Sequence, residues 1–102
     1  QMMAFIEENF RDPNMSLSVV AQHFSISEGY VSQYIKRCTG KNYSAHLEEL
    51  RMNEAMRLLT QTQLPIGEIV KKSGFEYKNT FYKAFKKHFG VPPNTFREER
   101  RE

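Results

Sequence analysis

The sequence predicts an all-α fold of about seven helices, arranged as two helix-turn-helix subdomains joined by a long linker helix. Three observations support this fold class. Apolar residues recur at helical spacing along the chain, and no stretch alternates with the period of two that a half-buried strand requires. The segments between the expected helices are only a few residues long. The pattern of the first half also recurs in the second half.

Two short helices are expected first, over about residues 2–10 and 17–24. Pro13 separates them, because proline disfavours helical backbone at the residue before it. Ser16 is a suitable N-cap for the second helix, since its side-chain oxygen can accept a hydrogen bond from a free backbone amide. The chain therefore opens with a helix, a turn and a capped helix.

A third helix is expected from the cap Ser27 to about Cys38, and Gly40 can supply the left-handed residue that ends it. Its inner face consists of Val31, Tyr34, Ile35 and Cys38. We therefore expect Cys38 to pack in the core. It is the only cysteine, so no disulfide forms within the chain, which fits a reducing, cytoplasmic environment.

The longest helix is expected over about residues 44–61, with Ser44 as its N-cap. Its apolar residues are spread around more than one side, which predicts neighbours on both sides. We therefore interpret this helix as a connector. The predicted division of the chain is a first helix-turn-helix subdomain, the linker helix and a second helix-turn-helix subdomain, over residues 1–43, 44–61 and 62–102.

The second half is expected to hold three more helices. Pro65 suits the first turn of a helix that runs to about Ser73, where Gly74 breaks it. The next helix covers about residues 78–89, and a proline pair can start a last short helix anchored by Phe96. This arrangement repeats the helix, turn, helix and glycine of the first half.

The helix over residues 78–89 has two chemically different faces. The inner face carries Phe81, Ala84, Phe85, His88 and Phe89. The outer face carries Asn79, Lys83, Lys86 and Lys87. A rigid helix with a cationic, hydrogen-bonding outer face suits a DNA major groove, although soluble helices also solvate their outer faces with lysine.

The internal repeat decides between these interpretations. Val31, Ile35, Lys36 and Gly40 correspond to Phe81, Phe85, Lys86 and Gly90, each 50 positions later. The preceding helices correspond at a distance of 49, which predicts a longer turn in the second copy at residues 74–77. Two such units on one stiff helix can present two recognition helices to successive major-groove segments, roughly 34 Å apart. A tandem helical protein-interaction module is the alternative.

Composition narrows the function further. The net charge is +3, and the bases lie mostly at and after Lys36, which favours a polyanionic partner. The three histidines fall on different expected helices, and no metal-ligand spacing or phosphate-binding loop occurs, so we expect neither an enzyme, nor a metal, nor a cofactor. No stretch approaches the ~20 apolar residues of a membrane helix, so no membrane partner is expected.

These residues carry a family resemblance. The run from Pro65 to Arg97 resembles the signature of the AraC/XylS family of bacterial transcription regulators. The matching residues are Gly74-Phe75, Phe85-Lys86, Phe89-Gly90, Pro93 and Phe96-Arg97. Leu50-Arg51 and the run from Ala55 to Leu59 resemble the family's linker helix, and the first half is a looser match.

The resemblance implies a two-lobed domain that binds double-stranded DNA and activates or represses transcription. It also implies a sensing or receiver domain that is missing from this fragment. The acidic first helix, together with Glu48 and Glu49, is a candidate surface for a protein partner, either RNA polymerase or that missing domain.

The predicted DNA-binding residues lie on the two recognition helices. In the first unit, Ser32 and Gln33 are assigned to base edges, and Lys36 and Arg37 to phosphates. In the second unit, base or groove contacts are assigned to Lys78, Asn79, Thr80 and Lys83, and phosphate contacts to Lys86 and Lys87. Gly29 offers no side chain, so the first unit has fewer groups with which to read bases.

Overall fold

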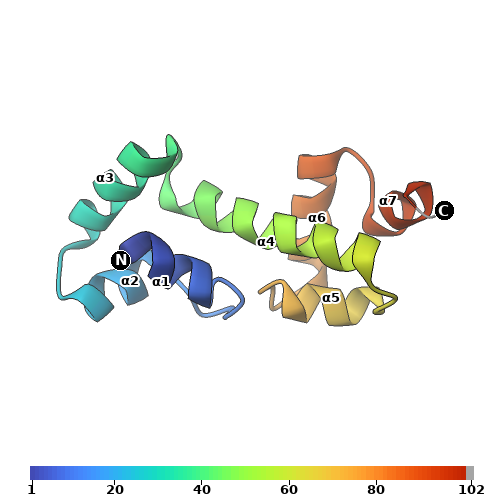
Figure 1. Cartoon of the computed structure of the whole chain (residues 1–102), viewed down its shortest axis with the longest axis horizontal. Helices are drawn as coiled ribbons and strands as arrows, with labels where there is room; N and C mark the ends of the chain where they lie inside the picture. The colour runs from blue at the N-terminus through green and yellow to red at the C-terminus, as the bar shows by residue number, and fades with distance from the viewer. Residues whose placement is uncertain (101–102) are drawn as a thin grey trace.

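The computed structural model describes residues 1–100, which contain seven α-helices and no β-strand. The predicted all-α class is therefore confirmed. The helices are α1 (Met2–Asn9), α2 (Leu17–Phe24), α3 (Glu28–Thr39), α4 (Tyr43–Gln61), α5 (Ile66–Lys72), α6 (Lys78–Phe89) and α7 (Pro93–Glu99). The molecule is elongated, 46 × 23 × 22 Å, because α4 runs lengthwise between two groups of shorter helices (Figure 1).

The core is divided between the two ends of α4. At one end, α1, α2 and α3 pack with the start of α4, and we call this group the first lobe. Its core residues are Met2, Ile6, Phe10, Met15, Val20, Ala21, Val31, Ile35, Tyr43 and Leu47. At the other end, α5, α6 and α7 pack with the rest of α4 and form the second lobe. Its core residues are Met52, Ala55, Leu58, Leu59, Ile69, Val70, Phe75, Phe81, Ala84, Phe85 and Phe96. The boundaries 43/44 and 61/62 stay a prediction.

Side-chain caps fix where three of the helices begin. The Ser16 hydroxyl accepts a hydrogen bond from the Val19 amide at 3.2 Å, as predicted for α2. The Ser27 hydroxyl accepts from the Tyr30 amide at 3.1 Å, as predicted for α3. For α4 the predicted cap was wrong, because Asn42 has the extended backbone of an N-cap and accepts from the Ala45 amide at 2.8 Å. Ser44 lies inside the first turn instead.

The two helix-turn-helix turns correspond residue by residue up to one insertion. The amides of Ile26 and Phe75 donate to the carbonyls of Ala21 and Val70, both at 3.0 Å, which preserves the spacing of 49. The next cap residues, Ser27 and Tyr77, are 50 apart. The second turn therefore holds one extra residue between its hydrogen bond and its cap, within the segment predicted to be longer.

A residue with left-handed backbone conformation ends α2, and its equivalent in the repeat begins the second turn. Ser25 has φ 56° and corresponds to Gly74, which has φ 103°. Serine seldom adopts this conformation, because its Cβ crowds the backbone there, and Ser25 is the one non-glycine residue with positive φ among residues 1–100. The same turn geometry is thus built from a permissive residue in one lobe and a strained one in the other.

Two residues predicted to be buried are exposed, and they occupy equivalent places in the repeat. Cys38 is exposed on α3, and His88 is exposed on α6, 50 positions later. Both lie on the inner side by helical periodicity, but in the last turn of each helix, where the neighbouring residues Thr39 and Phe89 are only half-buried. His88 Nε2 instead lies 3.3 Å from a carboxylate oxygen of Glu48 on α4.

Candidate nucleic-acid interface

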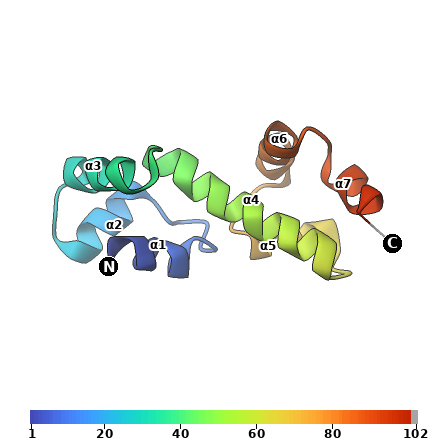
Figure 2. The same ribbon diagram turned by 45° about the horizontal axis from the view of Figure 1, so that its top comes forward.

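The two recognition helices share one side of the molecule. Figure 2 shows α3 and α6 along the upper edge of the molecule, with α1 along the lower edge and α5 overlapping α4. Each helix is 12 residues long and ends at a glycine in the left-handed conformation, Gly40 with φ 77° and Gly90 with φ 82°. The repeat therefore gives both lobes a helix of the same length, on the same side.

Equivalent buried residues anchor the two helices. Val31 and Ile35 hold α3 in the first core, and Phe81 and Phe85 hold α6 in the second, all four without exposed surface. Phe85 also packs against the rings of Phe89 and Phe96, with ring centroids 4.6 Å and 5.4 Å away. Because these rings fix the rotation of α6, its opposite face is fixed as the outer one.

The predicted site residues lie on the outer faces of these helices. On α3, Gln33, Lys36 and Arg37 are exposed, and Ser32 is half-buried. On α6, all six predicted residues are exposed: Lys78, Asn79, Thr80, Lys83, Lys86 and Lys87. The fold therefore gathers each predicted set on one helix, and the set on α6 is larger and more accessible than the set on α3.

The cations on these faces are uncompensated. Within residues 1–100, the ion pairs involve Arg11, Arg57, Lys41 and His88, and none involves a lysine or arginine of the predicted site. By contrast, Arg57 and Arg11 both bind Glu54, at 2.8 Å and 3.3 Å. Excess positive charge therefore remains on the α3 and α6 faces, available to an external anion.

A shallow hollow of about 470 Å³ runs along α6, lined by Tyr82, Lys83, Lys86 and Lys87. Three of the four lining residues are cations, and Tyr82 supplies a half-buried ring. Lysine stems can lie along such an apolar surface while their ammonium groups reach outward. This geometry places apolar and cationic groups side by side on the outer face of the helix.

Two exposed tyrosines were missing from the predicted site. Tyr30 is 53% exposed in the first turn of α3, and Tyr77 is 65% exposed at the N-cap of α6. Both stand at the beginning of a recognition helix. The sequence signal that could have identified them is an aromatic residue that lies outside the apolar stripe of its helix.

The beginnings of the two helices also differ. The Ser27 hydroxyl occupies one first-turn amide of α3, whereas Tyr77 makes no side-chain cap at α6. The first amides of a helix carry partial positive charge and seek acceptors. In α6 these amides stand beside Lys78 and Asn79, which strengthens the preference of this end for an anion.

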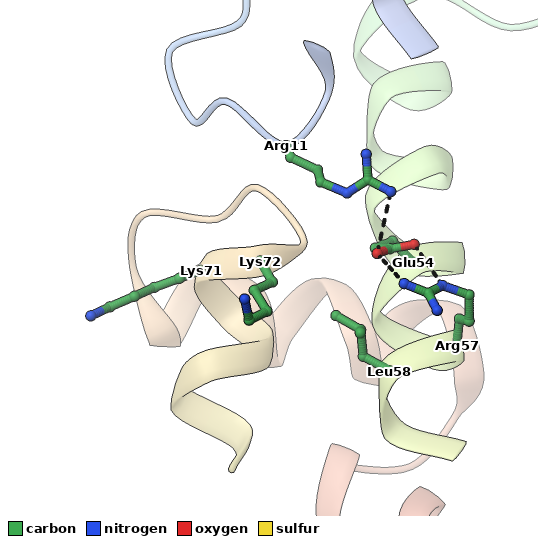
Figure 3. A pocket seen from close by; sticks show the side chains of 6 residues that line it. All are labelled: Arg11, Glu54, Arg57, Leu58, Lys71 and Lys72. Carbon is green, nitrogen blue, oxygen red and sulfur yellow. Dashed lines mark hydrogen bonds and ion pairs between the residues drawn. The ribbon is translucent and has the colours of Figure 1, made fainter. Parts of the chain in front are cut away.

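A second cationic region lies between the lobes, away from α3 and α6. It is a cleft of about 410 Å³ lined by Arg11, Glu54, Arg57, Leu58, Lys71 and Lys72 (Figure 3). In Figure 3, Arg11 and Arg57 reach the Glu54 carboxylate from two sides. The hydrogen bond from Arg57 is the main cause of the lowered pKa of Glu54. These arginines are therefore engaged within the protein.

No cluster of histidine, cysteine, aspartate and glutamate in residues 1–100 has the arrangement of a metal site. None of the helices described here is both long and apolar enough to span a bilayer.

The sequence is similar to several regulatory proteins. The arabinose operon regulatory protein of Escherichia coli K12 is 30% identical over 93 residues, which is 91% of this chain and 32% of that protein. The multiple antibiotic resistance protein MarA of the same strain is 28% identical over 96 residues, 94% of this chain and 75% of that protein. The chain thus spans about a third of the length of the arabinose regulator and most of the length of MarA.

Solved structures share the fold. The C-terminal domain of AraT, a response regulator from Geobacillus stearothermophilus, has a TM-score of 0.95 and 35% identity, covering 99% of this chain and 84% of that one. The DNA-binding domain of AdpA, solved with a target DNA, has a TM-score of 0.89 at 19% identity, covering 96% and 87%. A family model described as a helix-turn-helix domain matches residues 20–99. The chain therefore belongs to the AraC-type helix-turn-helix family, as its Gly-Phe and Phe-Gly-x-x-Pro signature predicted.

Proposed function

We propose that this chain binds double-stranded DNA in a sequence-specific manner and thereby regulates bacterial transcription, with α3 and α6 in successive major-groove segments. The observation that carries the proposal is the pair of outward, uncompensated polar faces on α3 and α6, which lie along the same edge of the molecule in Figure 2. An α-helix fits the major groove, where each base pair presents a distinct pattern of donors and acceptors.

Base recognition is assigned to amide and amine groups in the first half of each recognition helix. Gln33 on α3 and Asn79 on α6 can each pair with adenine through two hydrogen bonds, and Lys83 can donate to guanine. Ser32, Lys78 and Thr80 complete the two sets. Tyr30 and Tyr77 add exposed rings at the entry of each helix, where they can contact thymine methyl groups or sugars.

Phosphate contacts are assigned to the last turns of the two helices. Lys36 and Arg37 on α3 are equivalent in the repeat to Lys86 and Lys87 on α6. Such contacts fix the register of a protein on DNA without reading sequence, and they make binding weaker as salt rises. The equivalence supports one docking mode, used twice.

The size of the molecule suits two contacts on one face of the duplex. Two major-groove segments on the same face are roughly 34 Å apart. The long dimension of the protein is 46 Å, so both lobes can reach such segments. Any mismatch between the two recognition helices and straight DNA is met by bending the duplex, at a cost of a few kcal/mol.

We also propose that this chain works as one domain of a longer protein. Relatives such as the arabinose regulator are about three times as long as this chain, so we infer that a sensing or receiver domain accompanies it. RNA polymerase is the proposed partner in activation. Glu7 and Glu8 on α1 remain exposed for a protein contact, whereas Glu48 and Glu49 already pair with His88 and Lys41. Since bacterial DNA lies in the cytoplasm, the protein is placed there, and its function requires neither catalysis nor a cofactor.

The test begins with selection of bound sites from a random duplex library. Paired half-sites about one helical turn apart are expected, because both recognition helices read DNA. A single short motif would mean that only one lobe reads sequence. Failure to bind any duplex at low salt would reject the proposal in favour of a protein-interaction module, since counterion release gives DNA binding its steep salt dependence.

Lys83→Ala then tests the role of α6. It should weaken binding to the selected site by about 1–3 kcal/mol, with a smaller loss on random DNA, as measured by fluorescence anisotropy at fixed salt. Lys72→Ala is the matched control, because Lys72 is an exposed lysine of the same lobe that lies in the cleft between the lobes. Equal losses on both DNAs would make Lys83 a phosphate contact, and no loss would remove it from the site.

A further inference from the structure

The two lobes meet beside the middle of α4. The segment that follows α1 lies against the middle of α4, where Arg51 holds it. The Arg51 Nε donates to the Phe10 carbonyl at 2.9 Å, and Nη2 donates to the Asp12 carbonyl at 2.9 Å. One guanidinium on the shared helix thus binds two backbone carbonyls of the first lobe.

The same guanidinium touches the second lobe. Its central carbon lies 5.7 Å from the centroid of the Phe75 ring. A Cβ atom on Gly74 would lie only 2.7 Å from Arg51 Nε and 2.5 Å from the Phe10 carbonyl oxygen. The turn of the second helix-turn-helix is therefore packed against the Phe10 segment of the first lobe, and the Arg51 side chain contacts both.

Little else joins the lobes apart from α4 itself. The principal helix-to-helix contacts stay within a lobe or involve α4. The neighbouring ion pair between Arg11 and Glu54, at 3.3 Å, also ties the segment after α1 to α4 (Figure 3). Without this junction, the angle between the lobes would depend on the stiffness of one 19-residue helix.

We propose that Arg51 is a positioning residue that fixes α3 relative to α6 and thereby selects the separation of the two half-sites on DNA. The inference rests on the proposed function. Adding one base pair between half-sites moves the second one by about 3.4 Å and rotates it by about 35°. To follow the second half-site, the Phe10 segment must move away from Arg51 or from Gly74. Hydrogen bonds are lost beyond roughly 3.5 Å, so a shift of this size breaks those that Arg51 makes. The junction therefore opposes the wrong spacing.

The test varies the spacing while leaving each half-site unchanged. Anisotropy titrations of the selected paired site are compared with sites one and two base pairs longer or shorter, for wild type and Arg51→Lys. Lysine keeps the charge but loses the fork that holds two carbonyls at once. We expect the preference for the best spacing over its neighbours to fall about five- to tenfold, as expected for loss of charge-assisted hydrogen bonds. Arg57→Lys is the matched control, because Arg57 lies on the same helix but binds only Glu54.

A second measurement needs no DNA. Cys38 is exposed on α3 and is the only cysteine, so a spin label there can be paired with one at Lys87→Cys on α6. Pulsed dipolar spectroscopy should give a broader distance distribution in Arg51→Lys than in wild type, at unchanged far-ultraviolet circular dichroism. Arg57→Lys should keep the wild-type distribution.

The outcomes separate the two proposals. An unchanged spacing profile in Arg51→Lys, or equal losses at every spacing, would overturn the positioning role and leave DNA binding intact. A wild-type protein that binds no paired site would overturn the proposed function, while the spin-label distances would still report on the junction. An unchanged distance distribution would also reject the positioning role.

Discussion

Replacing Gly74 with alanine should destabilise the protein more than replacing Gly90 with alanine, although both glycines have positive φ in the second lobe. Gly74 has φ 103° and Gly90 has φ 82°. Either alanine carries the cost of a left-handed backbone, about 1–2 kcal/mol. The two positions differ in what surrounds them, so the pair separates backbone strain from packing.

The surroundings give the expected difference. Nothing in the described part of the chain lies within 4 Å of a Cβ added at Gly90. The cost of Gly90→Ala is therefore limited to backbone strain. At Gly74 the new methyl group would meet the Phe10 carbonyl oxygen at 2.5 Å and the Arg11 Cα at 3.2 Å. Both are backbone atoms that cannot rotate away, and such overpacking costs about 1–3 kcal/mol more. Gly74→Ala should therefore cost about 2–5 kcal/mol in total.

The free energy of unfolding of both variants is measured by urea titration monitored by circular dichroism and extrapolated to water. For a chain of this size, the added 1–3 kcal/mol also lowers Tm by at least about 4 °C relative to Gly90→Ala. Equal stabilities of the two variants would show that the segment after α1 does not press on Gly74. That result would also remove the packing argument for the lobe junction.

Three further predictions concern the core, α3 and the Glu54 network. Phe85→Ala should cost about 3–5 kcal/mol by urea unfolding, because its ring is fully buried among other aromatic rings. Gly29→Ala should stabilise the protein by up to about 1 kcal/mol in thermal unfolding, because the added methyl group meets only the Ser27 hydroxyl, at 4.0 Å. The lowered pKa of Glu54 means that its contribution to stability is present above the ordinary carboxyl pKa, about 4.3, and is lost as pH falls through the lower folded pKa. Glu54→Gln should therefore reduce the loss of stability in acid.

Each of these has a contradicting outcome. A loss below about 1 kcal/mol in Phe85→Ala would mean that the second core closes around the missing ring. A destabilised Gly29→Ala would indicate that α3 is distorted at its first turn. For Glu54, an equal loss of stability between neutral pH and acid in the variant and the wild type would mean that the two arginines contribute nothing through this carboxylate.

Local features of the fold were readable from the sequence, and long-range features were not. The caps Ser16 and Ser27 and the stop at Gly40 act on backbone groups within a few residues, so their chemistry is visible in the sequence. Periodicity also gives the direction of each helix face. It does not say where along the helix axis the core ends, which is why Cys38 and His88, at equivalent places, were both assigned wrongly.

The contact between the two lobes at Arg51 could not be predicted from any such local pattern. Arg51 reaches a carbonyl 41 positions away, and nothing near Arg51 in the sequence identifies that partner. For the candidate site, the sequence identified the outer faces of α3 and α6, because anchors such as Phe85 determine which side is left outside. It missed Tyr30 and Tyr77, whose exposure depends on how far each helix entry protrudes from the core.

The separation of the two cores has a consequence for how such a chain can change over generations. Within residues 1–100, no buried residue belongs to both clusters. Substitutions at distant sites without shared partners act additively, so a change in one core leaves the tolerance of the other untouched. The outer residues of one lobe can therefore change without affecting the packing of the other lobe. The extra residue in the second turn and the left-handed Ser25 in the first show that the two lobes tolerate different solutions at equivalent places.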